Sequence, residues 1–142
     1  APGSGKTTAL RDMIRLFSER GYRVGVADER GEISGDGEFD LGPCSDVITG
    51  LSKAESAMLL LRGMNPQIIA MDEITQSADA DAIRELCCCG VELLATAHAR
   101  NADELRQRRV FAELLDTGAF KYALSIRGAG SARSYELEGL YV

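Results

Sequence analysis

The first residues of the chain have the spacing of a phosphate-binding loop. The run Ala1-Pro2-Gly3-Ser4-Gly5-Lys6-Thr7 matches every position but the first of the pattern G-x-x-x-x-G-K-S/T. Its glycines let the backbone curl so that N–H groups point at phosphate oxygens, and the following helix adds the positive end of its dipole. Lys6 can reach the terminal phosphates and the Thr7 hydroxyl can bind Mg²⁺. We therefore expect a nucleoside triphosphate to bind at Pro2, Gly3, Ser4, Gly5, Lys6, Thr7 and Thr8.

Two adjacent carboxylates, Asp72 and Glu73, end an apolar run that begins at residue 67. A buried strand that ends in acidic residues presents them at the edge of a parallel sheet where ligands bind. We expect Asp72 to bind Mg²⁺ together with Thr7, and Glu73 to orient or deprotonate the attacking water. The pair favours hydrolysing motors over small-molecule kinases and GTPases, and the guanine-binding pattern N-K-x-D is absent. The alternative is a solvated strand end.

Polar side chains also end the apolar run at residues 91–98. Thr96 and His98 stand where a side chain can contact the terminal phosphate or the water, and Asn101 is a weaker candidate. His98 is the one histidine of the chain, and a structural role is its alternative.

An acidic segment, Asp28-Glu29-Arg30-Gly31-Glu32, follows the strand predicted at residues 23–28. Glu32, or Glu29, could share the activation of water, and Arg30 could contact phosphate; the alternative is a solvated charged loop. Three further arginines are candidates to reach the site of a neighbouring subunit: Arg62, Arg127 and Arg133.

Helix and strand patterns alternate along the chain, which predicts an α/β fold with a mainly parallel sheet flanked by helices. Helices are expected at 7–20, 52–64, 77–89 and 103–116, the last with a break near residue 108, and strands at 23–28, 67–73 and 91–98. Ser52 and Ser77 are the expected N-caps. The glycine-rich stretch 29–51 is expected to be an irregular loop, and residues 120–137 predict a terminal β-hairpin.

The chain is long enough for one domain, residues 1–142, with a substantial core. The first strand before the phosphate loop is missing, so we expect two neighbouring strands to lack a partner and the chain to be part of a longer protein. Its net charge is −6, which argues against nucleic acid as a partner, although Arg106, Arg108 and Arg109 form a local basic cluster. No apolar run is long enough to insert into a membrane. The four cysteines lack the spacing of a disulfide framework, which predicts a cytoplasmic location.

The order of these motifs resembles that of the secretion and pilus-retraction ATPases, P-loop NTPases of the RecA/AAA-like (ASCE) type. The segments G-S-G-K-T-T, D-E-R-G-E-I, M-D-E-I and A-T-A-H-A follow one another as do the phosphate loop and the acidic, magnesium and histidine boxes of those proteins. Over nearly its whole length the chain resembles the sporulation stage III protein AA family. Thr75 departs from the pattern, because a glycine is expected after D-E-I.

The resemblance implies an ATP-hydrolysing hexameric motor at the cytoplasmic face of a membrane complex between mother cell and forespore. It implies phosphate and Mg²⁺ binding by Lys6 and Thr7, hydrolysis supported by Asp72 and Glu73, and the histidine-box position for His98. Three alternatives remain open: a nucleotide-gated scaffold with little hydrolysis, a recombinase- or helicase-like DNA-dependent ATPase, and a P-loop kinase.

Overall fold

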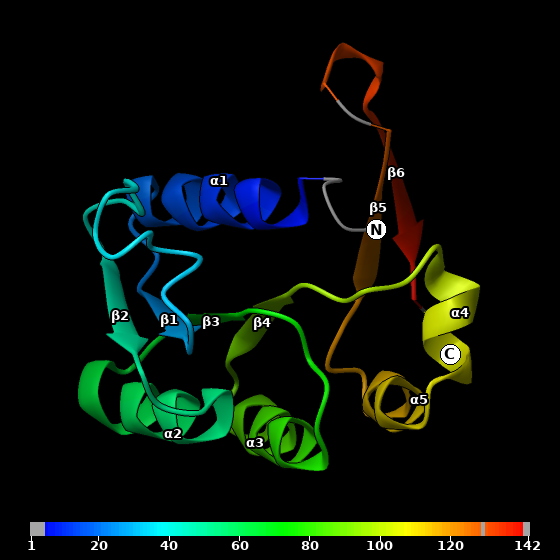
Figure 1. Cartoon of the computed structure of the whole chain (residues 1–142). Coiled ribbons are helices and arrows are strands. Elements are labelled where there is room, and N and C mark those ends of the chain that lie inside the picture. Colours follow the sequence, from blue (N-terminus) through cyan, green and yellow to red (C-terminus); the bar gives the residue numbers. More distant parts are fainter. Residues whose placement is uncertain (1–4, 129, 141–142) are drawn as a thin grey trace.

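The structure, a computed structural model, describes residues 5–128 and 130–140 (Figure 1). Its main sheet has four parallel strands in the order β2-β1-β3-β4. The strands are β1 (Val24–Asp28), β2 (Ser45–Thr49), β3 (Ile68–Met71) and β4 (Glu92–Ala95). All four run in one direction, so their carboxyl ends meet at one edge of the sheet.

Helices cover both faces of this sheet, as the sequence predicts (Figure 1). On one face lies α1 (Lys6–Glu19), which buries Leu10 and Ile14 against β1 and β3. On the other face lie α2 (Lys53–Met64) and α3 (Ser77–Cys88). The apolar spacing along α1 therefore sets which side of the helix faces the sheet.

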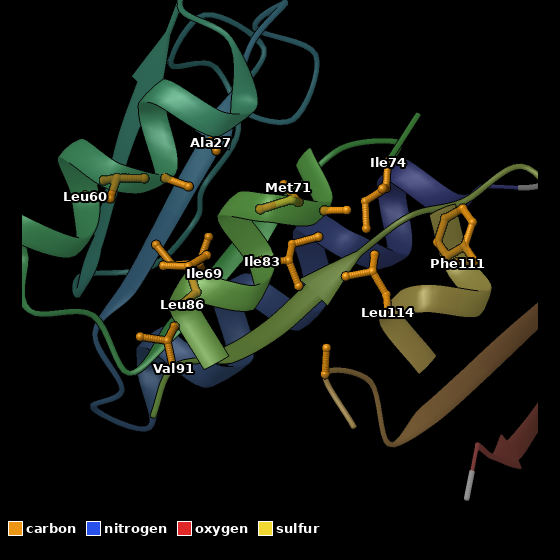
Figure 2. Close-up of a cluster of buried hydrophobic side chains, with 13 residues drawn as sticks. Ala27, Leu60, Ile69, Met71, Ile74, Ile83, Leu86, Val91, Phe111 and Leu114 are labelled. Carbon is orange, nitrogen blue, oxygen red and sulfur yellow. The ribbon is translucent and has the colours of Figure 1, made fainter. Parts of the chain in front are cut away.

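The larger core cluster lies between the sheet and α2, α3 and α5, and Figure 2 shows its side chains. Ile69 and Met71 of β3 are fully buried there, against Ile83 and Leu86 of α3. Burial of each such side chain contributes about 1.5–3 kcal/mol. The strand that leads into Asp72 is thus held by the core on both sides of the sheet.

Two local predictions are wrong. The stretch 29–51 is not wholly irregular, because it contains β2, an edge strand whose residues are mostly exposed and partly polar and so give a weak apolar signal. The N-cap of α3 is Gln76 rather than Ser77. The buried carboxylate of Asp79 accepts hydrogen bonds from the backbone N–H groups of Thr75 and Gln76, each at 3.2 Å, and so begins the helix one residue earlier.

The C-terminal third contains the predicted broken helix and the predicted hairpin. The helices α4 (Ala102–Gln107) and α5 (Arg109–Asp116) are separated at Arg108, which has an extended backbone. The hairpin pairs β5 (Tyr122–Arg127) with β6 (Ser134–Gly139) through the short 3₁₀ helix η1 (Gly130–Ala132). It forms a separate sheet, so within residues 5–128 and 130–140 both β4 and β5 have a strand partner on one side only.

None of the helices in the described part of the chain combines the length and the apolar character that crossing a lipid bilayer requires.

Candidate nucleotide-binding site

The N-terminal end of α1 carries the described half of the phosphate-loop motif. Gly5 is the N-cap residue, and its φ of +89° lies in the left-handed region that favours glycine. Lys6, Thr7 and Thr8 follow in the first turn, which contains no acidic side chain. The other predicted residues of the loop, Pro2, Gly3 and Ser4, lie outside the described residues.

The side chain of Lys6 reaches the segment that follows β4. Its Nζ donates a hydrogen bond to the carbonyl oxygen of Ala97 at 3.2 Å and lies 3.4 Å from Nδ1 of His98. The two predicted site residues Lys6 and His98, which are 92 positions apart, are therefore neighbours. Because a carbonyl oxygen is a poorer partner for an ammonium than a phosphate oxygen, this contact can be exchanged for a ligand.

A single hydroxyl connects the two acidic residues that follow β3. Thr96 Oγ1 donates to Asp72 Oδ1 at 3.0 Å and accepts from the backbone N–H of Glu73 at 2.9 Å. The register explains the contact, since Met71 of β3 pairs with Ala95 of β4 and the following residues stay adjacent. Thr96 thus fixes both the carboxylate of Asp72 and the backbone that carries Glu73.

The two predicted metal ligands, Thr7 and Asp72, suit Mg²⁺ held jointly with a nucleotide. Among the described residues, no group of three or more His, Cys, Asp or Glu side chains is arranged to hold a metal by itself. Mg²⁺ usually takes one or two carboxylates, several waters and phosphate oxygens rather than a cage of protein ligands. One hydroxyl and one carboxylate with a fixed orientation fit that requirement.

Glu32 and the Asp72-Glu73 pair line the same cavity, which has a volume of about 70 Å³. Its walls are formed by Glu29, Arg30, Glu32, Lys53, Asp72, Glu73 and Thr75. A larger cavity of about 410 Å³ lies along α1, and Thr8 is the one predicted site residue that borders it. The acidic segment after β1 and the acidic pair after β3 therefore meet in space.

Lys53 is a cavity residue that the sequence reasoning missed. It lies at the start of α2, its Nζ is 3.3 Å from Glu29 Oε2, and only 13% of its side chain is exposed. The helix dipole disfavours a lysine in the first turn of a helix. This unusual position is the signal in the sequence that could have identified Lys53 as a site residue. Its charge partly balances the surrounding carboxylates.

The acidic segment is held in place by Asp28, which is fully buried. Asp28 accepts hydrogen bonds from the backbone N–H groups of Ile33 at 3.0 Å and Ser34 at 2.9 Å. Arg11 of α1 donates to the carbonyl oxygens of Glu32 at 2.6 Å and Ile33 at 2.8 Å. The backbone at residues 32–34 is therefore tied both to β1 and to the phosphate-loop helix.

Three of the other candidates lie outside this site, whereas the fourth, Arg133, lies beside Gly5. Asn101 is the N-cap of α4, where its side chain accepts from the backbone N–H of Glu104 at 2.9 Å. Arg62 lies in the last turn of α2, and Arg127 pairs with Glu136 at 3.4 Å. Arg133 reaches the phosphate loop of its own chain: a Cβ at Gly5 would lie 2.6 Å from its Nη1.

The basic cluster of the C-terminal third is neutralised within the chain. Arg106 pairs with Asp103, Arg108 with Glu104 and Arg109 with Glu113, at 2.8, 3.2 and 3.4 Å. In all three pairs the partners are three or four residues apart, within α4, within α5 or at the break between them. The cluster therefore offers little free positive charge for a nucleic acid backbone.

Two solved structures with the same fold are ATPases, and one of them comes from a secretion system. The VirB11 ATPase of the Brucella suis type IV secretion system, solved in complex with sulphate, has a TM-score of 0.71 at 17% identity over 97% of this chain and 46% of that one. The Legionella pneumophila ATPase DotB has a TM-score of 0.68 at 18% identity over 96% of this chain and 42% of that one. The fold is that of the P-loop ATPases.

The chain belongs to the sporulation stage III, protein AA family, whose sequence profile matches residues 1–141. The stage III sporulation protein AA of Bacillus subtilis (strain 168) is 32% identical over 97% of this chain and 49% of its own length. The uncharacterized protein ycf45 of Porphyra purpurea is 32% identical over 85% of this chain and 22% of its own length. The chain thus spans about half or less of the length of these relatives.

Proposed function

We propose that this domain binds ATP with Mg²⁺ and hydrolyses it. The observation that carries the proposal is the continuous set of contacts from the phosphate loop to the acidic pair. Lys6 contacts Ala97, whose neighbour Thr96 bonds to Asp72 and to the backbone of Glu73. The likeness in fold to VirB11 and DotB, both called ATPases, supports the same activity.

In the proposed reaction, Lys6 exchanges the Ala97 carbonyl for the phosphates of ATP. Thr7 and Asp72 hold Mg²⁺, which when bound neutralises charge that develops on the transferred phosphoryl group. Glu73 orients the attacking water and accepts its proton, with Glu32 facing the same cavity. His98 is the proposed sensor of the terminal phosphate, a role that its contact with Lys6 supports.

As the role of the whole protein, we propose a motor that energises a membrane-associated, secretion-like complex during sporulation. This rests on the family and on the shared fold. We propose further that the protein assembles with copies of itself, as a hexamer, and works in the cytoplasm of the mother cell at the membrane, with other proteins of that complex as partners.

The test of the proposal is ATP hydrolysis by the full-length protein, measured with and without Mg²⁺ and across protein concentration. Glu73→Gln should lower the rate by about 10²- to 10⁴-fold, the usual effect of losing a general base. The matched control is Glu85→Gln, an exposed glutamate on α3, which should keep the wild-type rate.

A rate that rises more than linearly with concentration would support sites completed between subunits. ATP binding without any turnover would instead favour the nucleotide-gated scaffold. Stimulation by DNA that weakens with salt would favour the DNA-dependent ATPase.

A further inference from the structure

The guanidinium of Arg133 lies against the phosphate loop. A Cβ placed on Gly5 would be 2.6 Å from Nη1, 2.7 Å from Cζ and 3.0 Å from Nη2 of this side chain. Arg133 follows η1 at the start of β6, and the hairpin stands beside the N-terminal end of α1 (Figure 1). The φ of +89° is what favours a glycine at position 5, and the absence of a Cβ leaves room for the guanidinium beside it.

Close backbone contacts at the end of the hairpin constrain the main chain on either side of η1, next to Arg133. Gly128 has a φ of +80°, and a Cβ there would lie 2.6 Å from the carbonyl oxygen of Ala132. The backbone N–H of Arg133 donates to the carbonyl oxygen of Gly130 at 3.3 Å. The close approach of the two strands therefore fixes the backbone that carries the arginine.

The positive charge at this place lacks a counter-charge. Within residues 5–128 and 130–140, neither Lys6 nor Arg133 forms an ion pair, and the first turn of α1 has no acidic side chain. The Nε atom of Arg133 is buried and has no hydrogen-bond partner there. The other arginine of the hairpin, Arg127, differs because it is exposed and pairs with Glu136. Lys6, Arg133 and the N-terminal end of α1 together create a region of positive potential, which favours the binding of an anion.

We propose that Arg133 binds the phosphates of the nucleotide in its own chain, from the hairpin side of the loop. This rests on the proposed ATP site, which it deepens. A guanidinium can donate two parallel hydrogen bonds to phosphate oxygens, a geometry that a lysine lacks. Arg133 also connects the bound nucleotide to the hairpin. The strands of the hairpin form a sheet separate from the four-stranded sheet, whose carboxyl edge carries Asp72 and Glu73.

The test is calorimetric titration of the full-length protein with ATP and with inorganic pyrophosphate. Arg133→Gln should weaken both ligands by about 10- to 100-fold, the usual effect of losing hydrogen bonds to a charged group. Arg133→Lys should recover part of the affinity for both. The matched control is Arg127→Gln on the same hairpin, which should bind both ligands within about twofold of wild type.

Equal losses for ATP and pyrophosphate would show that the contact is to the phosphates. If Arg133→Gln bound both ligands as tightly as wild type while Lys6→Ala lost them, this inference would be overturned and the proposed ATP site would stand. If the wild-type protein and Lys6→Ala bound ATP equally, the proposed site itself would fail, and the role of Arg133 with it.

Discussion

The Thr96 hydroxyl donates a hydrogen bond to the Asp72 carboxylate over 3.0 Å. The same oxygen accepts the backbone N–H of Glu73 at 2.9 Å, so one side chain just after β4 orients both acidic residues that follow β3. The two predicted carboxylates are therefore positioned by the segment that also carries the contact to Lys6. Both halves of the proposed site depend on this segment at the carboxyl end of β4.

Replacement of Thr96 by valine keeps the shape of the side chain and removes the hydroxyl. We expect the free energy of unfolding to fall by about 0.5–1.5 kcal/mol, because two hydrogen bonds are lost at a partly exposed place. ATP hydrolysis should fall by about tenfold through the loss of orientation at Asp72 and Glu73. Steady-state turnover and urea denaturation measure both, and Thr96→Ser should stay near wild type. A valine variant that hydrolyses ATP at the wild-type rate would show that this hydroxyl does not orient the site.

Asp28 is a second side chain that fixes the backbone of a proposed site segment, in this case the acidic segment after β1. Asp28→Asn can accept only one of the two backbone hydrogen bonds from Ile33 and Ser34. We expect a loss of about 1–3 kcal/mol in the free energy of unfolding, because a buried backbone N–H is left without a partner. Chemical denaturation is the measurement, and the exposed Asp46→Asn on β2 is the control. Equal stability of the two variants would argue against this role of Asp28.

The cysteines should differ in reactivity. All four carry free thiols, and Cys88 and Cys89 are exposed whereas Cys87 is partly buried. Burial raises the pKa of the Cys87 thiol, and the neighbouring Cys88 and Glu92 raise it further. A raised pKa leaves less thiolate below that pKa, so iodoacetamide should modify Cys87 more slowly than Cys88 and Cys89 near neutral pH.

The difference should narrow as the pH rises towards the raised pKa of the Cys87 thiol, because the thiolate fraction of Cys87 then increases. Mass spectrometry of peptides after timed labelling at about pH 7.5 and about pH 9.5 follows both effects. Faster modification of Cys87 than of Cys88 and Cys89 near neutral pH would contradict the assigned burial.

Much of the fold could be predicted because the motifs stand at the ends of apolar runs. Asp72 and His98 each follow a run of buried or half-buried residues, and parallel strands bring such ends to one edge. The broken helix at Arg108 and the terminal hairpin were also confirmed. These features depend on local periodicity, which a single sequence carries.

The remaining features depend on tertiary placement. The edge strand β2 is mostly exposed, so its sequence lacks the apolar alternation that marks a strand. Lys53 and Arg133 are single charged residues whose positions follow from how α2 and the hairpin pack, and neither belongs to a motif. A sequence pattern cannot assign Arg133 to its own chain rather than to a neighbour.

The division of roles between Lys6 and Glu73 tests the account most directly. ATP binding and ATP turnover should be measured on the same preparations of full-length wild type, Lys6→Ala and Glu73→Gln. We expect Lys6→Ala to lose ATP binding, because it removes the cation that meets the phosphates, and Glu73→Gln to bind ATP like wild type but not turn it over. An equal loss of ATP binding in both variants would contradict the assignment of phosphate binding to Lys6 and of water activation to Glu73.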